Sequence, residues 1–151
     1  MIVLENLSAT ISFANRLAEI VGPGDIIGLS GDLGVGKTAF ARAFIRGENQ
    51  FLEVPSPTFT LVQMYNKEAL TIWHFDFYRL EQPDEIFELG IEDAFEEGVS
   101  LIEWPEKMGG YAPSEWLKLE LEPGYNEDSR YLTVVPIGMR GQKLARKMGS
   151  L

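Results

Sequence analysis

The amino-acid sequence predicts an α/β fold, in which a mixed sheet is parallel in its middle, antiparallel elsewhere and flanked by helices. Three observations support this. An apolar, strand-like run at residues 25–30 leads through a glycine-rich segment into a helix-like run at 37–46. Two more strand-like runs, 60–65 and 70–77, are joined by a link so short that it permits only an antiparallel hairpin. The 151 residues suffice for one domain with one core.

The predicted helices follow in chain order. Ser8 is a residue type that caps helices, and apolar residues at helical spacing follow it to about Val21. The helix at 37–46 is expected to close at Gly47, which is suited to a left-handed cap. Pro83 opens a helical region that runs to about Glu97 and is interrupted at Gly90. These helices supply the outer layers of the sandwich.

Three later runs complete the predicted sheet. They lie at 99–102, 116–121 and 131–137, and they are apolar or alternate between apolar and polar residues. A short basic tail follows at 139–151, for which we expect a helix or a mobile end. We therefore expect the whole chain, 1–151, to form a single domain.

Composition excludes several function classes. The formal net charge is −10, which argues against direct binding to nucleic acid, because such binding depends on Lys and Arg. The chain has no cysteine, so disulfides and thiol chemistry are ruled out. We find no membrane-spanning apolar run, and the start at Met1 lacks the features of a secretion signal. These observations predict a cytoplasmic protein that does not act at a membrane.

The segment at 31–38 carries the main functional signal. It reads Gly-Asp-Leu-Gly-Val-Gly-Lys-Thr, which is the G-x-x-x-x-G-K-[ST] pattern of a phosphate-binding loop. Glycines there let backbone N–H groups approach phosphate oxygens, and the following helix presents its positive end. We expect nucleotide contacts from a continuous run: Asp32, Leu33, Gly34, Val35, Gly36, Lys37, Thr38 and Ala39. In this pattern Lys37 reaches the β- and γ-phosphates and Thr38 ligates Mg²⁺. The fold prediction thus becomes a three-layer sandwich like that of P-loop NTPases.

Hydrolysis requires a carboxylate at the metal and a group that orients water. Asp76 ends the strand-like run at 70–75, and Glu103 ends the run at 99–102. Both positions suit a carboxylate beside Mg²⁺ or beside the attacking water. We therefore expect Lys37, Asp76 and Glu103 to be catalytic, and Thr38, Asp76 and Glu103 to be candidate metal ligands. Which carboxylate holds the metal and which orients water stays open.

Four segments occur in a characteristic order: G-D-L-G-V-G-K-T at 31–38, S-P-T-F at 56–59, H-F-D-F-Y-R-L at 74–80 and I-E-W-P-E at 102–106. Together they resemble the TsaE (YjeE) family of P-loop ATPases. The resemblance covers about residues 7–137. It implies an ATP- and Mg²⁺-dependent ATPase required for threonylcarbamoylation of an adenosine in tRNA. It also implies TsaD and TsaB-like partners, which would carry out the transfer, so that this chain meets tRNA only through the complex.

The resemblance also implies roles for single residues. Lys37 would bind ATP, and Thr58 would lie in a switch-like loop that faces the γ-phosphate. Asp76 would assist the metal, and Glu103 would serve hydrolysis. Trp104 follows Glu103 and would border the nucleotide, although a packing role is equally compatible with its position.

Alternatives remain for other residues and for the reaction. We interpret His74 as a partly buried strand residue rather than a catalyst, and Trp73 as sheet core. Seven acidic residues between 84 and 97 fit the solvated face of helices, with a docking surface as the alternative. A GTP switch would need an Asn-Lys-x-Asp segment, whereas Asn66-Lys67 is followed by Glu68-Ala69. A small-molecule kinase, or an ATP-sensing module without turnover, would use the same loop.

Overall fold

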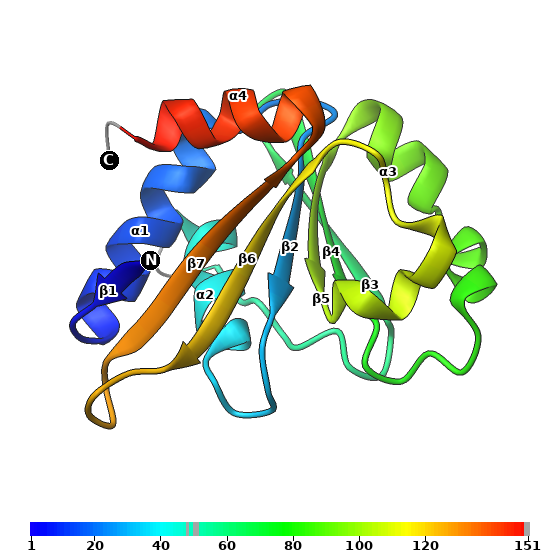
Figure 1. The fold of residues 1–151 in the computed structure, drawn as a ribbon. Helices are drawn as coiled ribbons and strands as arrows, with labels where there is room; N and C mark the ends of the chain where they lie inside the picture. Colours follow the sequence, from blue (N-terminus) through cyan, green and yellow to red (C-terminus); the bar gives the residue numbers. More distant parts are fainter. Residues whose placement is uncertain (48, 50–51, 150–151) are drawn as a thin grey trace.

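The computed structural model describes residues 1–47, 49 and 52–149, and its centre is a mixed sheet (Figure 1). Among these residues, seven strands lie in the order β1-β7-β6-β2-β5-β4-β3. Their bounds are β1 Ile2–Leu4, β2 Ile26–Ser30, β3 Val62–Lys67, β4 Leu70–Asp76, β5 Val99–Glu103, β6 Trp116–Pro123 and β7 Arg130–Ile137. Strands β6, β2, β5 and β4 run parallel, whereas β1, β7 and β3 join antiparallel. The predicted mixed sheet and its hairpin are confirmed.

Helices cover both faces of this sheet (Figure 1). Their bounds are α1 Leu7–Ile20, α2 Lys37–Arg46, α3 Ile91–Glu97 and α4 Gly138–Met148, with 3₁₀ helices η1 at Pro83–Leu89 and η2 at Pro105–Tyr111. One buried cluster joins α1, α2 and α4 to the sheet, and a second joins η1, α3 and η2 to it. This arrangement is the predicted three-layer sandwich. No described helix has the length and apolar character that crossing a membrane requires.

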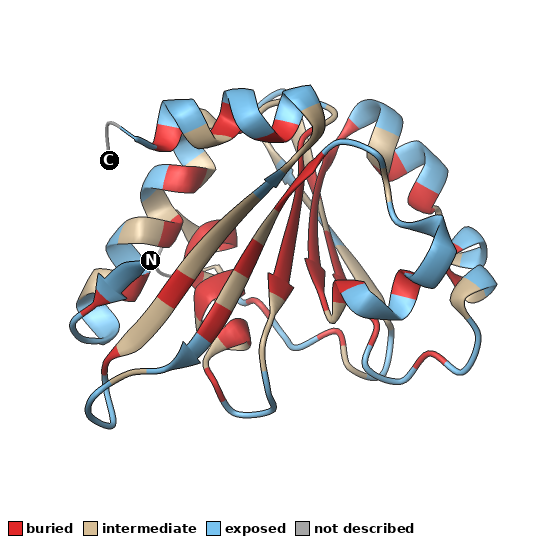
Figure 2. Cartoon of the chain, viewed as in Figure 1, coloured by how far each residue is buried: buried red, intermediate tan, exposed pale blue. Residues whose placement is uncertain are grey.

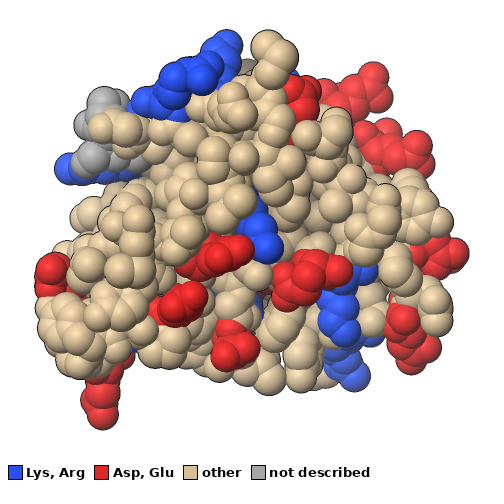
Figure 3. All heavy atoms as spheres, in the orientation of Figure 1, with Lys and Arg blue, Asp and Glu red and all other residues tan. Residues whose placement is uncertain are grey.

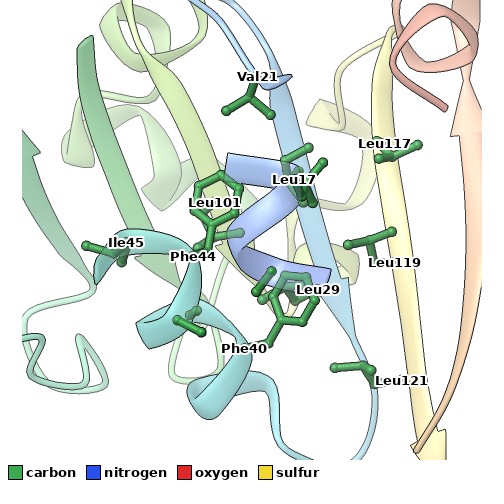
Figure 4. Close-up of a cluster of buried hydrophobic side chains, with 14 of the residues drawn as sticks. Leu17, Val21, Leu29, Phe40, Phe44, Ile45, Leu101, Leu117, Leu119 and Leu121 are labelled. Atoms are coloured by element: carbon green, nitrogen blue, oxygen red, sulfur yellow. The ribbon is translucent and has the colours of Figure 1, made fainter. Parts of the chain in front are cut away.

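The central parallel strands are the most buried part of the sheet (Figure 2). Phe40 and Phe44 of α2 pack near Leu29 of β2 and Leu119 of β6, as Figure 4 shows. These side chains are completely buried. The helix that follows the glycine-rich loop is therefore anchored to the core, so its first turn is held in place at the carboxyl end of the parallel strands.

Several boundaries differ from the sequence prediction. Helix α1 begins at Leu7 and is capped by Asn6 rather than Ser8, because Ala9 N donates to Asn6 Oδ1 at 2.9 Å. Strand β1 and helix η2 were not predicted. Gly90 separates η1 from α3 with a φ of 82°, as its position in the acidic segment indicated. The predicted tail helix at 139–151 corresponds to α4, although residues 150 and 151 lie outside the described part of the chain.

Candidate functional site

The glycine-rich loop connects β2 to α2 at the carboxyl end of the parallel strands. Gly31, Gly34 and Gly36 all have positive φ values, of 147°, 80° and 109°. A Cβ on Gly31 would lie 2.6 Å from the Leu121 carbonyl oxygen, so this glycine is required by space as well as by conformation. The loop leads directly into the first turn of α2, where unpaired N–H groups and the helix dipole favour an anion.

Lys37 lies over this loop and is buried, with 5% of its surface exposed. Its Nζ donates to the carbonyl oxygen of Gly31 and to that of Asp32, the latter at 3.3 Å. Nζ also lies 3.7 Å from the centroid of the Trp104 ring. Burial lowers the pKa of Lys37, and nearby carboxylates, Glu103 first, partly oppose this. The ammonium is therefore desolvated, which strengthens its attraction for a phosphate.

Trp104 is placed by unusual backbone geometry. Its φ of 60° and ψ of 52° lie in the left-handed region, which residues other than glycine seldom adopt. Its ring centroid lies 5.0 Å from that of Tyr78, in addition to the contact with Lys37. Trp104 also packs against the second buried cluster, so its position at the rim of the site is compatible with both of the roles left open.

Glu103 ends β5 at the centre of the site and is almost completely buried. One carboxylate oxygen, Oε1, lies 3.4 Å from Thr38 Oγ1, which donates to it. The other, Oε2, lies 2.7 Å from His74 Nε2. The structure thus brings together Thr38 and Glu103, two of the predicted metal ligands. His74 lies on a strand as predicted, but it is completely rather than partly buried and it contacts this carboxylate directly.

Asp76 ends β4 and is paired in register with Glu103 on β5. Its carboxylate accepts from Thr58 Oγ1 at 3.1 Å and from the Tyr78 backbone N–H at 3.0 Å. Burial raises the pKa of Asp76, and the negative charge of Glu103 adds to this. The hydrogen bonds from Tyr78 and Thr58 act in the opposite direction. Two carboxylates that lie close together with little solvent repel each other, and a bound divalent cation would stabilise the pair.

Thr58 reaches Asp76 from the loop before β3, so the structure joins a third segment to the site. Ser56 Oγ lies 2.7 Å from Thr58 Oγ1. Phe59, two positions after Pro57, is exposed, and the Arg79 guanidinium lies 4.8 Å from its ring centroid. The Ser-Pro-Thr-Phe segment therefore places one residue in the site and the next on the surface.

A cavity beside the loop was not predicted. It measures ≈190 Å³ and lies between the start of α1, the glycine-rich loop and β7, with Val35, Gly36 and Ala39 on one side and Asp128 and Arg130 on the other. Arg130 Nε donates to the Val35 carbonyl oxygen at 2.6 Å, so β7 supports the loop. No motif surrounds Arg130, and only the pairing of β7 with β6 brings it here.

Two of the predicted nucleotide contacts lie at the edge of the site, because the side chains of Asp32 and Leu33 are exposed. Arg42 and Arg46 of α2 donate to the carbonyl oxygens of Val54 and Leu52, both at 3.0 Å, and so support the loop that carries these two residues.

The predicted metal ligands Thr38, Asp76 and Glu103 include two carboxylates. Within the described ranges, no cluster of three or more His, Cys, Asp or Glu side chains has a metal-binding arrangement. A metal held here would therefore take its remaining ligands from phosphate oxygens and water, which is the usual arrangement for Mg²⁺ in phosphate sites.

Charge is unevenly distributed outside the site. Most of the acidic side chains of η1 and α3 are exposed, which supports the interpretation of a solvated face. Glu85 instead closes the start of η1, where its carboxylate accepts from the backbone N–H of Glu81 and of Gln82. Figure 3 shows Lys and Arg side chains gathered over α4, and acidic side chains spread over the right-hand and lower parts of the view.

The fold and this arrangement of side chains define a protein of the P-loop type. Comparison with known proteins identifies the family. The family model described as "Threonylcarbamoyl adenosine biosynthesis protein TsaE" matches residues 4–132. The chain therefore belongs to the TsaE family.

Individual relatives support the same family assignment. A "tRNA threonylcarbamoyladenosine biosynthesis protein TsaE" of Rickettsia felis is 40% identical over 138 residues, which cover 89% of this chain and 79% of the relative. The Bacillus subtilis protein of the same description is 35% identical over 144 residues, covering 95% and 89%. The crystal structure of Bacillus subtilis YdiB superimposes with a TM-score of 0.77 at 30% identity, covering 99% of this chain and 93% of that one.

Proposed function

We propose that this chain is a Mg²⁺-dependent ATPase that supports tRNA threonylcarbamoylation. The observation that carries the ATPase proposal is the convergence of four groups at the carboxyl end of the parallel strands: Lys37, Thr38, Asp76 and Glu103. The pathway proposal rests on the family and on the descriptions of the relatives.

Each group has a chemical task in this proposal. The backbone N–H groups of the loop and the Lys37 ammonium bind and orient the phosphates. Thr38 and Asp76 would hold Mg²⁺, which supplies positive charge to the transferred phosphoryl group. Glu103 holds or deprotonates the attacking water. Thr58 contacts Asp76 from a separate loop, so its position is suited to distinguish nucleotide states.

The cavity beside Val35 and Arg130 is suited to receive the base and sugar. It adjoins the first turn of α2, on the side away from Glu103. In this proposal the base would lie between the start of α1 and the hairpin that carries Asp128. The proposed preference for ATP over GTP rests on the absence of an Asn-Lys-x-Asp segment from the sequence.

Partners complete the proposal. The net charge of −10 makes direct tRNA binding unfavourable, so we propose that the chain acts through TsaD and TsaB-like proteins. The described residues offer no free arginine aimed at the loop: Arg42 and Arg46 support another segment, Arg79 lies over Phe59, and Arg130 donates to backbone carbonyls. A group that stabilises the transition state would then come from a partner.

We expect the isolated protein to hydrolyse ATP slowly and to be stimulated by its partners. A stabilising group supplied in trans increases P-loop hydrolysis by about 10³ to 10⁵-fold in known systems. The measurement is phosphate release at saturating ATP and Mg²⁺, from the chain alone and with TsaD and TsaB. Phosphate released without any acceptor distinguishes an ATPase from a small-molecule kinase. Fast hydrolysis by the chain alone, unchanged by partners, would contradict the proposal.

Asp76→Asn is expected to lower the ATPase activity and to raise the stability of the folded protein. Because burial raises the pKa of Asp76, the folded protein holds this proton more tightly than the unfolded chain. Stability therefore falls as the pH rises above the ordinary Asp value, and an amide removes that penalty. Without nucleotide or metal, we expect the Asn variant to resist denaturant better than wild type at neutral pH. This difference in stability should become smaller at about pH 4. Mg²⁺-dependent turnover should fall on the order of 10-fold or more.

The matched control for this variant is Asp93→Asn, which removes an exposed carboxylate from α3. It should change neither unfolding nor turnover. If Asp76→Asn left the Mg²⁺ dependence of turnover unchanged, Asp76 would not be part of the metal site.

A further inference from the structure

The contact between His74 and Glu103 joins two buried polar side chains on neighbouring strands. His74 lies on β4 and Glu103 on β5, with 0% and 2% of their surfaces exposed. The distance from Nε2 to Oε2 is 2.7 Å. An ionised carboxylate can only accept, so the contact with such a carboxylate requires a hydrogen on Nε2. Nδ1 is buried and has no hydrogen-bond partner in the described part of the chain.

This arrangement is costly for a residue that serves packing alone. A buried ring nitrogen without a partner carries a desolvation penalty that an apolar side chain would avoid. The strand around it is apolar, with Phe75 and Ile72 completely or almost completely buried. A leucine would fill the same space without that penalty. The contact between Nε2 and the Glu103 carboxylate therefore explains why this position holds a polar ring.

The contact fixes the direction of the Glu103 carboxylate. His74 Nε2 holds Oε2, and Oε1 is left facing Thr38 Oγ1 at 3.4 Å. Without the ring, Glu103 would be free to rotate or to move toward the Lys37 ammonium, which attracts it electrostatically. A carboxylate that must meet a metal or an attacking water needs one orientation, and buried hydrogen bonds from a neighbouring group provide it.

We propose that His74 is a positioning residue that holds the Glu103 carboxylate toward Thr38. This inference rests on the proposed ATPase function. The Nε2–H of the ring is the acting group, so a side chain that presents an N–H donor at the same reach replaces it. His74 itself contacts neither nucleotide nor the reacting atoms.

The first test compares two substitutions. His74→Leu keeps the volume and removes the donor, whereas His74→Gln keeps an N–H donor at a similar distance from the backbone. In the partner-activated reaction, the leucine variant should lose about 10 to 100-fold in kcat with little change in KM. The glutamine variant should recover most of that loss. Equal loss in both variants, with both folded, would overturn the proposal.

The second test asks whether His74 acts through Glu103. In a Glu103→Gln background, His74→Leu should have no further effect on turnover, because the carboxylate that it positions is already absent. An additional 10 to 100-fold loss in the double variant would show that His74 has an independent role and would overturn the proposal. Ile72→Val, a small change in the same strand, controls for altered packing.

A third measurement is independent of turnover. His74 is the only histidine in the chain, so the ring nitrogen NMR signals of the labelled protein belong to it alone. The structure predicts hydrogen on Nε2, and a change in these signals in Glu103→Gln. Hydrogen on Nδ1 alone would overturn the inference. If wild type fails to hydrolyse ATP even with partners, the proposed function fails, while this spectrum still tests the contact.

Discussion

Lys37→Ala is expected to abolish productive ATP hydrolysis while leaving the domain folded. Loss of a preorganised group that stabilises developing charge costs about 10² to 10³-fold in rate, and Lys37 also contributes to phosphate binding. Its ammonium is the cation that lies over the glycine-rich loop, bonded to the carbonyl oxygens of Gly31 and Asp32. Alanine leaves the phosphates without it.

The fold should tolerate this change. Burial lowers the pKa of Lys37, so the folded protein disfavours the charged ammonium, and its removal relieves that cost. The lost hydrogen bonds to loop carbonyls act in the opposite direction, so the two effects partly cancel. Circular dichroism and phosphate release measure the two parts of the prediction. Lys143→Ala, on exposed α4, is the control and should behave as wild type. A folded Lys37→Ala protein with normal hydrolysis would contradict the phosphate-loop assignment.

Glu103→Gln is expected to separate nucleotide binding from hydrolysis. The amide keeps the size of the side chain, accepts from His74 through its oxygen and donates toward Thr38. It cannot accept a proton from water, and loss of a general base costs about 10² to 10⁴-fold in kcat. Affinity for ATP should change little, because a group that orients water acts chiefly in the transition state.

The measurement for Glu103→Gln pairs ATP affinity from calorimetry with phosphate release. Glu96→Gln, which changes an exposed carboxylate on α3, is the matched control. If the Glu103 variant loses ATP binding together with hydrolysis, Glu103 holds the metal or the fold rather than the water. That outcome would leave Asp76 as the candidate for the opposite task.

The centre of the site was predictable because it depends on local sequence. Gly31 to Thr38 define their own loop geometry, and Asp76 and Glu103 each follow an apolar run that ends at the same edge of a parallel sheet. His74 and Asp76 are two positions apart on one strand, so the alternation of strand side chains puts them on the same face. What it did not show was the contact with Glu103, because that contact depends on how β4 and β5 align across the sheet.

Other features depend on pairing between distant segments. Strand β1 has three residues, too few to show a period, and exists because Val3 pairs with Tyr131 on β7. Arg130 reaches the loop only through the β6–β7 hairpin. The capping of α1 by Asn6 instead of Ser8 was a choice between two suitable residues close together, which sequence alone does not decide.

If ATP turnover at the site of Lys37 drives tRNA threonylcarbamoylation, removal of Lys37 must stop repeated modification of tRNA. Modified tRNA is measured over many turnovers in a mixture of tRNA, the threonylcarbamoyl donor, TsaD, TsaB and either wild-type protein or Lys37→Ala. We expect continuing modification with the wild type and its arrest with the alanine variant. Equal modification with both proteins, or with neither protein added, would contradict this expectation.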